Sequence, residues 1–502
     1  MTLKTHAKKP TILVMGDQIN RNISSLVGQS PSTARILMVE IEKKFDSNQW
    51  HIQKAHLILS AMRHFADELR QEGFEVDYRV SKDLVTGITE HSKEFMPEEI
   101  VVMEPMNWNG QKIAEKCGLK IIRNNQFLCH YEDFAGWVGS RKSFKMEDFY
   151  RWQRKRLKVL MDGDSPIGGK WNFDHENRER PPRDGRKWPE VKLFTHDQID
   201  KEILSSLGNA WGAAPKGIWP VTREQALIRL DEFIHGALPI FGPYEDAMLS
   251  QEWKLAHSVL SSSLNIGLLH PSELVAAAEF SYHDGNAPIN SVEGFIRQII
   301  GWREYVWGLY WLWMPEYRNS NYLEVNREVP PAFLEKDATE MACISGAMDH
   351  LYEYAYTHHI ERLMVFGNLS LTSGLNPQGV INWMWSRFID GAEWVMLPNV
   401  LGMAVHADGG KMATKPYASG GAYINRMSNY CSDCIYDPKK RSGELACPFT
   451  TLYWDFLARN ENKLSNNPRM GQQYAGLRRL SNLDEVRNRA SEVLFHLDDG
   501  TL

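Results

Sequence analysis

Two hydrophobic periodicities divide this chain and limit the folds open to it. Within the first 130 residues, short apolar runs of strand length alternate with stretches of helical periodicity. The runs expected as strands are 11–15, 34–40, 75–80, 100–104 and 120–123, and the clearest helix is 55–72. Such alternation predicts strand-helix-strand units that form a parallel, Rossmann-like α/β domain.

Beyond about residue 221 the strand pattern is replaced by helical periodicity. The ranges expected as helices are 222–236, 244–263, 291–313, 345–366 and 377–388. Between the two patterns, 163–190 is rich in Gly, Pro, Asp and Arg, which is typical of a long surface connection. The sequence therefore predicts an α/β domain over 1–130, an interdomain linker over 131–220 and a large all-α domain over 221–502.

Composition narrows the class of protein. With 43% hydrophobic and 24% charged residues in 502, the chain has the values of an ordinary globular enzyme. The apolar segment 12–15 is too short for a signal-peptide core or a membrane span, so we expect a cytoplasmic monomer without a membrane partner. The formal net charge of -6 does not indicate a nucleic-acid binder, but a local basic patch leaves DNA binding open.

Four of the six cysteines have the pattern of a metal or cluster site. Cys431 and Cys434 form a CxxC pair, Cys447 follows before a proline, and Cys343 lies far upstream. Zinc ribbons usually pair two CxxC motifs, whereas an iron-sulfur cluster accepts this wider spread, and proline after a ligand cysteine recurs in ferredoxins. Spacing alone leaves an iron-sulfur cluster, a structural zinc ion and unrelated thiols as alternatives.

Three segments of the helical half contain residues suited to a flavin nucleotide. Hydroxyls and helix-end amides in 256–271 can bind a pyrophosphate, although small residues at helix contacts would give the same pattern. A Trp-Arg-Glu sequence follows at 302–304. Further on, Arg362 and Asp390 carry opposite charges and could form an ion pair.

These segments resemble the photolyase/cryptochrome superfamily and, together with the cysteines, its bacterial iron-sulfur branch, the prokaryotic (6-4) photolyases. The resemblance covers nearly the whole chain and implies FAD in the helical domain, a [4Fe-4S] cluster on the four cysteines and a 6,7-dimethyl-8-ribityllumazine antenna in the α/β domain. The residues that it implies for FAD are His257, Ser258, Ser261, Arg303, Arg362, Asp390 and Asn399. The chain departs from the superfamily at 390–392, where Asp-Gly-Ala replaces Asp-Gly-Asp, and around Asn399.

The resemblance implies light-dependent repair of pyrimidine-pyrimidone (6-4) photoproducts in UV-damaged DNA. Repair needs one electron from reduced FAD and a proton, for which His359 is the preferred donor and His358 the second. Trp383 is expected to begin photoreduction, with Tyr423 as a further relay. The alternatives are a cryptochrome-like blue-light photoreceptor without repair activity and a zinc-stabilised nucleic-acid-binding protein without flavin.

Strand ends and basic runs supply the remaining candidates. The antenna residues expected at the carboxyl ends of strands are Gly16, Asp17, Gln18 and Glu40, with Glu104 equally well placed. The basic runs 151–156, 178–186 and 439–441 are candidates for phosphate contacts. Asp174 and Asp246 are expected near the DNA face, where they would require Mg²⁺ to screen their charge.

Overall fold

The N-terminal part of the protein is a five-stranded parallel sheet. The computed structural model describes residues 8–45, 47 and 49–502. The expectation that the N-terminus contains no signal peptide concerns partly residues 1–7, which lie outside the described residues. The strands are β1 (Thr11–Val14), β2 (Arg35–Ile41), β3 (Glu75–Ser81), β4 (Ile100–Met103) and β5 (Lys120–Ile122). Their order, β3-β2-β1-β4-β5, and their parallel pairing confirm the predicted α/β fold.

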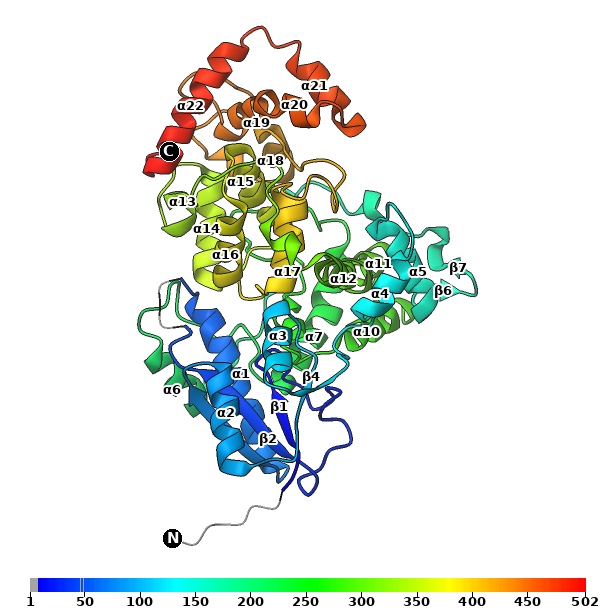
Figure 1. Cartoon of the computed structure of the whole chain (residues 1–502). Coiled ribbons are helices and arrows are strands. Elements are labelled where there is room, and N and C mark those ends of the chain that lie inside the picture. The colour runs from blue at the N-terminus through cyan, green and yellow to red at the C-terminus, as the bar shows by residue number, and fades with distance from the viewer. Residues whose placement is uncertain (1–7, 46, 48) are drawn as a thin grey trace.

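Helices cover both faces of this sheet. Along β1, Ile12 and Val14 are buried with α1 (Ile52–Gln71), whereas Leu13 is buried on the other face with α2 (Leu84–Phe95) and α3 (Trp108–Lys116). This alternation follows from the period of two residues in a strand. The sheet and α1 form the lower part of the molecule, and most of the helical region lies above them (Figure 1).

The segment expected as a linker contains three α-helices and a short antiparallel pair of strands. These elements are α4 (Tyr131–Val138), α5 (Met146–Leu157), β6 (Met161–Asp162), β7 (Ser165–Pro166) and α6 (Gln198–Ser206). Helices α4 and α5 pack on the helical region, while α6 packs on α1. The segment thus contacts both parts of the molecule.

The rest of the chain is helical. Its α-helices are α7 (Arg223–Glu232), α8 (Leu238–Phe241), α9 (Ser261–Asn265), α10 (Pro271–His283), α11 (Ile289–Ile296), α12 (Glu304–Trp313), α13 (Pro331–Leu334), α14 (Ala342–Tyr354), α15 (Asn368–Ser373), α16 (Pro377–Arg387), α17 (Glu393–Leu397), α18 (Gly421–Met427), α19 (Pro448–Arg459), α20 (Glu461–Leu464), α21 (Gly471–Leu477) and α22 (Leu483–Asp499). None of the described helices is long and apolar enough to cross a membrane.

The expected helix over 244–263 is wrong for most of its length. Only the residues from Ser261 onward are helical, and the backbone before them turns through the left-handed region at Leu255 (φ 46°) and Val259 (φ 49°). A left-handed residue interrupts an α-helix, so the apolar periodicity of this segment reflects burial in an irregular chain.

Three wide, π-helical turns interrupt the helices around the centre of the molecule. They span Arg297–Arg303, Glu361–Gly367 and Pro398–Ala404. Such turns are uncommon and occur frequently at functional sites. Each of these three carries one of the predicted FAD residues, namely Arg303, Arg362 and Asn399.

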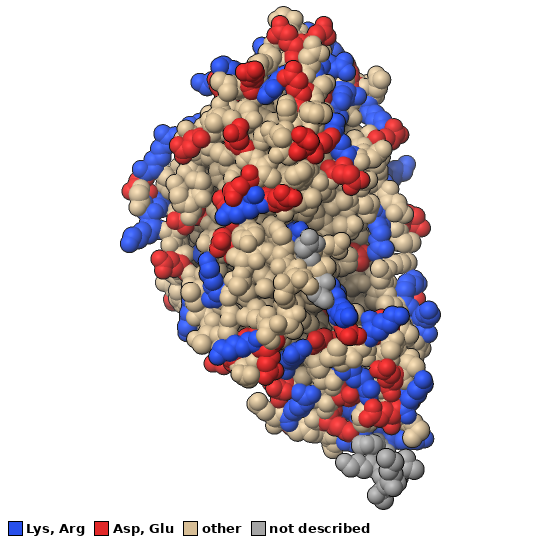
Figure 2. All heavy atoms as spheres, turned by 90° about the vertical axis from the view of Figure 1, so that its left-hand side faces the viewer, with Lys and Arg blue, Asp and Glu red and all other residues tan. Residues whose placement is uncertain are grey.

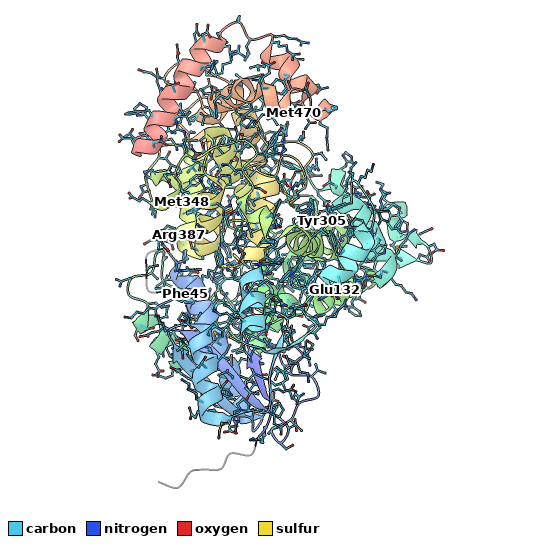
Figure 3. All side chains as sticks on the ribbon, in the orientation of Figure 1. Phe45, Glu132, Tyr305, Met348, Arg387 and Met470 are labelled. Atoms are coloured by element: carbon cyan, nitrogen blue, oxygen red, sulfur yellow. The ribbon has the colours of Figure 1, made fainter. Side chains whose placement is uncertain are left out.

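A buried lysine joins the α/β region to the helices. Nζ of Lys54, on α1, donates hydrogen bonds to the carbonyl oxygens of Trp385, Phe388 (3.1 Å) and Gly391 (2.6 Å) at the end of α16. Arg387 lies at the same junction, above Phe45 in Figure 3, and its guanidinium stacks 4.1 Å from the ring of Trp211. The carbonyl oxygens that a helix end leaves without partners are thus satisfied from the α/β region.

Candidate functional site

A cavity of about 450 Å³ opens in the helical region. Its volume is within the range of cofactor sites. All seven predicted FAD residues line it, together with His359, and they come from segments far apart in the sequence. The structure therefore brings together the residues that three separate sequence segments contributed.

An ion pair lies in the wall of this cavity. Nη1 of Arg362 donates to Oδ1 of Asp390 over 2.8 Å, and the hydroxyl of Ser261 donates to Oδ2 over 2.7 Å. Burial opposes ionisation of Asp390, but the charge and hydrogen bond of Arg362, with the Ser261 bond, hold its pKa below the ordinary value. The cavity thus keeps a fixed carboxylate and a fixed guanidinium side by side.

Several hydrogen-bond donors on the cavity wall have no partner among the residues that the structure describes. They are Nη2 of Arg362 and Nε and Nη2 of Arg303, and Nε2 of His257 is a further buried atom without a partner among the described residues. Arg303 also lies 4.0 Å above the ring of Phe127, and its Nη1 donates to Glu304 over 3.0 Å. Because buried donors are normally satisfied, this set suits a polar, anionic ligand in the cavity.

The two adjacent histidines occupy different positions. His359 lines the cavity and is exposed to it, but it lies deep in the protein, and this burial, with the charge of Arg362, lowers its pKa to about 4. His358 lies behind the wall, where its ring stacks on that of His257 at 4.7 Å. We expected a donor with a pKa near neutrality, and without a ligand His359 is instead neutral at pH 7.

A buried carboxylate connects the histidine stack to the cysteines. Oε1 of Glu361 accepts a hydrogen bond from the hydroxyl of Tyr430 over 2.5 Å, and Oε2 lies 3.9 Å from Nε2 of His358. His350 lies 3.4 Å from the same carboxylate. Tyr430 also lines the cysteine pocket described below, so polar side chains lie between the two sites, with a break at His358, whose ring nitrogens have no hydrogen-bond partner among the described residues. Nothing in the sequence motifs indicated this role of Glu361.

The predicted electron-transfer residues lie outside the cavity lining. Trp383 is buried among Phe333, Phe366 and Phe388, and its indole nitrogen donates to the carbonyl of Phe333 over 2.7 Å. Its neighbour Met384 reaches the cavity instead. The tryptophans that do line the cavity are Trp302, which belongs to the Trp-Arg-Glu sequence, and Trp394.

Tyr423, the second expected relay, lies on α18, half-buried beside the acidic side of the cavity. Its pKa is raised by burial and by the charge of Asp246, a cavity residue. The guanidinium of Arg426 stacks 5.4 Å from its ring. These contacts place Tyr423 near Asp246, outside the cavity lining.

Acidic residues gather at one side of the cavity. Asp174 forms an ion pair with Arg178, and Asp246 lies 4.0 Å from the same guanidinium. Burial raises the pKa of Asp246 to about 6 and that of Glu245 to about 8, the latter against the charge of Arg297. We expected Asp174 and Asp246 to repel phosphate, but Arg178 offsets much of their charge.

The four cysteines line one small apolar pocket. The pocket is enclosed by α14, α18, the start of α19 and the segment 430–436, with Ile424, Tyr430 and Phe449 among its walls. Burial raises the pKa of the Cys431 thiol to about 12, and the other thiols add to the shift. Gly421 permits this approach, because a Cβ there would lie 2.8 Å from Sγ of Cys447. Four convergent thiols in an apolar enclosure suit a metal ion or cluster.

The predicted antenna residues lie at the carboxyl ends of β1 and β2. Gln18 is buried and donates to the carbonyl of Met103 over 2.9 Å, and Glu40 is held by Arg63 (2.8 Å) and by the hydroxyl of Tyr78 (2.5 Å). A Cβ at Gly16 would meet Sδ of Met62 at 3.0 Å. Burial raises the pKa of the Asp17 carboxyl to about 6, against the charge of Lys44.

The alternative antenna residue, Glu104, is engaged within the protein. Its carboxylate pairs with His130 at 2.6 Å and accepts a hydrogen bond from the hydroxyl of Tyr131. These bonds, with its burial, give Glu104 a structural environment at the end of β4.

The basic runs differ in exposure. In the run 151–156, Arg154 is fully buried and donates to the carbonyl oxygens of Val159 (3.3 Å) and Trp171 (2.9 Å), so this residue is structural rather than a phosphate contact. Arg178 is exposed at the cavity. On the face shown in Figure 2, Lys and Arg side chains are interspersed with Asp and Glu on either side of a neutral central area.

Comparisons with known proteins agree with this geometry. A family described as deoxyribodipyrimidine photo-lyase-related protein matches residues 12–215. A curated protein of Agrobacterium fabrum (strain C58 / ATCC 33970), named (6-4) photolyase, is 42% identical over 505 residues, which cover 97% of this chain and 99% of that protein.

Two solved structures share the fold. A bacterial class III photolyase from Agrobacterium tumefaciens covers 99% of both chains at 16% identity with a TM-score of 0.55. A cryptochrome from Synechocystis sp. PCC6803 covers 92% of both chains at 13% identity with a TM-score of 0.53. At these identities the likeness concerns the arrangement of the elements.

Proposed function

The chain belongs to the photolyase/cryptochrome superfamily, and from this premise we propose that it is a (6-4) DNA photolyase. In this reaction, light drives the repair of pyrimidine-pyrimidone (6-4) photoproducts in UV-damaged DNA. The observation that carries the proposal is the cavity in which the Arg362–Asp390 pair and His359 meet. The likeness to a named (6-4) photolyase over nearly the whole chain supports the choice of lesion.

The cavity fits FAD, the cofactor of this superfamily. Among the described residues, buried donors of Arg303 and Arg362 lack partners, as a site for an anionic dinucleotide requires. Ser258 and Ser261 on the same wall add hydroxyls, and Asn399 adds an amide. When bound and reduced, FAD supplies the electron that the excited-state reaction delivers to the lesion.

The side chains around the cavity position charge and a proton. The hydroxyl of Ser261 donates a hydrogen bond to a carboxylate oxygen of Asp390, and the side-chain amide of Asn265 donates one to the main-chain carbonyl of Asp390 at 2.9 Å. These two bonds keep the carboxylate beside Arg362. An imidazole nitrogen of His359 gives the proton to the lesion and later recovers it. His358, stacked on His257, fixes the wall behind His359 and is the second donor candidate.

We assign the cysteine pocket to a [4Fe-4S] cluster held by Cys343, Cys431, Cys434 and Cys447. Four cysteine thiolates in an apolar enclosure suit such a cluster. Burial keeps the thiols protonated, and cluster binding would replace their protons with iron. We infer a structural role, because the pocket joins α14 to α18 and α19. Iron and acid-labile sulfide in the purified protein would test the assignment, and zinc in their place would overturn it.

We place a ribityllumazine antenna at the carboxyl ends of β1 and β2. Gly16, Asp17 and Gln18 follow β1, and Glu40 is near the end of β2, which is where parallel sheets bind ligands. The test is extraction of the chromophore followed by its absorption spectrum. A protein that binds FAD but releases no second chromophore under these conditions would contradict this placement.

DNA is the expected partner, and we propose that it approaches the cavity past Arg178 with the protein as a monomer. Arg178 is the cation beside Asp174 and Asp246. When DNA phosphates bind Arg178, Mg²⁺ would bind Asp174 and Asp246 in its place. Repair rates that do not change on chelation would contradict the Mg²⁺ proposal.

Trp383, with Tyr423 as a further relay, is proposed to carry electrons during photoreduction. Replacing Trp383 with phenylalanine should slow photoreduction of the bound cofactor and leave repair by chemically reduced protein intact. Unchanged photoreduction would favour Trp302 or Trp394, which line the cavity.

The decisive experiment is anaerobic illumination of the reduced protein with two oligonucleotides, one carrying a (6-4) photoproduct and the other a cyclobutane dimer. Restoration of the first alone supports the proposal. Failure on both with normal photoreduction would make the protein a cryptochrome-like blue-light photoreceptor.

A further inference from the structure

Lys54, the buried lysine of α1, reaches the segment that carries the cavity carboxylate. It is 2% exposed, and its Nζ donates to the carbonyl oxygens of Trp385, Phe388 (3.1 Å) and Gly391 (2.6 Å). An ammonium group has three donors, so these bonds use all of them. Because Phe388 and Gly391 stand on either side of Asp390 in the chain, the lysine holds the backbone that carries this carboxylate.

This position is shaped for a cation. A Cβ at Gly391 would lie 2.9 Å from Nζ of Lys54 and 2.6 Å from the carbonyl oxygen of Trp385, so the lysine can approach this closely only because residue 391 is a glycine. The acceptors lie at the carboxyl end of α16, where the carbonyl groups of a helix carry partial negative charge. An ammonium group is therefore favoured here.

The charge of Lys54 also acts on the ion pair in the cavity wall. Burial raises the pKa of Asp390, but the charge of Arg362 and, to a lesser extent, that of Lys54 lower it. Conversely, burial lowers the pKa of Lys54, and the charge of Asp390 opposes that shift. The lysine thus supports the carboxylate both through the backbone and through its charge.

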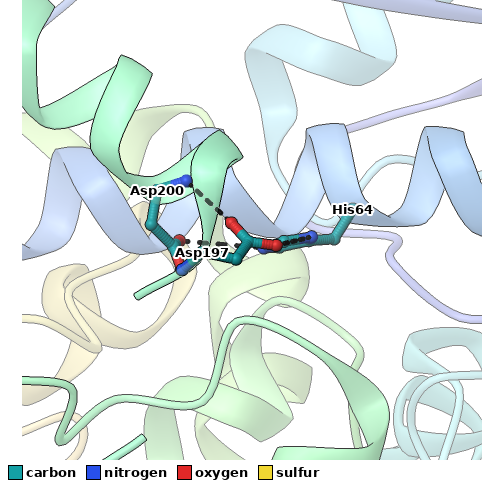
Figure 4. A group of neighbouring side chains, drawn as sticks. All are labelled: His64, Asp197 and Asp200. Carbon is teal, nitrogen blue, oxygen red and sulfur yellow. Dashed lines mark hydrogen bonds and ion pairs between the residues drawn. The ribbon is translucent and has the colours of Figure 1, made fainter. Parts of the chain in front are cut away.

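The helix that presents Lys54 is held on another side by α6. Ten residues further along α1, Nδ1 of His64 lies 3.8 Å from Oδ2 of Asp197, and its Nε2 lies 3.7 Å from Oδ1 of Asp200 (Figure 4). Nε2 of His56 lies 3.1 Å from the same oxygen of Asp200. Groups that fix a functional site act best from a rigid element, and α1 is anchored in this way.

We propose that Lys54 is a positioning residue for the flavin site. From α1 it holds the segment 388–391 so that Asp390 stays beside Arg362, and it thereby couples the docking of the α/β region to the charge that the cofactor meets. Lys54 lies outside the cavity lining, so it acts through Asp390. This inference rests on the proposed function, because it assigns the lysine to the FAD site.

Gln53, the neighbour of Lys54 on α1, offers a matched control. It is 1% exposed, and its Nε2 donates to the carbonyl oxygens of Ala213 (3.1 Å) and Glu353 (2.7 Å), the latter near the end of α14. Gln53→Leu therefore removes contacts of α1 with a different helix end, away from Asp390. If Lys54 only joined the two parts of the molecule, Lys54→Met and Gln53→Leu would affect the cofactor alike.

The first measurement is hydrogen exchange in full-length protein freed of FAD. The main-chain amides of Ile389 and Gly391 donate to carbonyl oxygens over 2.7 and 3.0 Å. Lys54→Met should speed their exchange, because the segment loses its hold, whereas Gln53→Leu should leave it at the wild-type rate. Equal exchange in Lys54→Met and wild type would overturn the proposal.

The second measurement is the Kd of FAD. Lys54→Met should weaken binding by about tenfold, and it should add nothing in an Asp390→Asn background, because residues that act through one another are not additive. An equal loss in Gln53→Leu, or additive losses in the double variant, would overturn the role through Asp390. Wild-type protein that binds no FAD would overturn the proposed function, while hydrogen exchange would still decide whether Lys54 holds the segment.

The third measurement separates charge from hydrogen bonding. Lys54→Gln removes the charge but keeps an amide donor, so it should change hydrogen exchange less than Lys54→Met does. At pH 6, where a pKa of about 7 leaves Lys54 mostly protonated, it should also lower the reduction potential of bound FAD, because a nearby cation stabilises the reduced, anionic form. Gln53→Leu should keep the wild-type potential. A potential that Lys54→Gln leaves unchanged would overturn the electrostatic part of the proposal.

Discussion

Replacing His359 with glutamine tests the proton donor most directly. The pKa of about 4 means that roughly one molecule in 10³ carries the proton at pH 7. Burial and the charge of Arg362 cause this shift, so an anionic lesion in the cavity should raise the pKa again. Loss of the donor should slow repair by about 10²–10⁴-fold and leave photoreduction intact.

The assay is anaerobic repair of an oligonucleotide with one (6-4) photoproduct, measured per absorbed photon from about pH 5 to 8, where proteins tend to be most stable. For wild type, kcat/KM reports the free enzyme and should fall about tenfold per pH unit across this range, because the protonated form is required. The kcat profile should fall at higher pH, since it reports the complex. His283→Gln, an exposed histidine, is the control.

Two results would refute this reasoning. If His359→Gln repaired within about tenfold of wild type with the same pH profile, His359 would not be the proton donor. If His359→Gln lost repair but wild-type kcat/KM did not change with pH over this range, His359 would still be the proton donor. The low pKa of His359 in the free enzyme would then be wrong.

Three further predictions concern stability and the bound groups. Burial lowers the pKa of Lys54 to about 7. Between pH 7 and 10.5 the unfolded chain therefore binds more protons than the folded protein does, and the free energy of unfolding should rise with pH there by an amount on the order of 4 kcal/mol. Urea unfolding at both ends of the window should show that rise in wild type and lose it in Lys54→Met; a variant that keeps the full rise contradicts the assignment. Asp390→Asn leaves Arg362 without its buried carboxylate, so unfolding should become about 3 kcal/mol easier and FAD fluorescence should show release; unchanged FAD retention would count against the site. Cys434→Ser should lose iron and sulfide on elemental analysis, and full iron content would remove Cys434 from the ligands.

The sequence by itself determined the strands and helices in which burial repeats regularly along the chain. The apolar runs predicted the strands of the sheet to within one or two residues, and the helical period predicted α1 and α16, because a strand or helix repeats its burial every two or 3.6 residues. The same rule failed over 244–263. There the buried positions belong to an irregular segment that packs around the cavity, and periodicity cannot separate that case from a helix.

Sequence motifs also predicted which residues would gather around a flavin and a cluster. The seven residues inferred for FAD line one cavity, and the four cysteines share one pocket, although both sets come from segments far apart in the chain that only the fold brings together. What the motifs could not give is the electrostatic state. The pKa of His359 depends on burial by residues distant in sequence and on the approach of Arg362.

Only the tertiary structure decided which distant residues meet. Arg154 became a buried structural residue rather than a DNA contact, and Glu361 came to connect His358 with Tyr430. The ion pair of His56 with Asp200 forms where α6 packs on α1, between segments more than 130 residues apart. Such contacts depend on how whole elements pack, whereas a sequence pattern reports mainly the burial and spacing of neighbours along the chain.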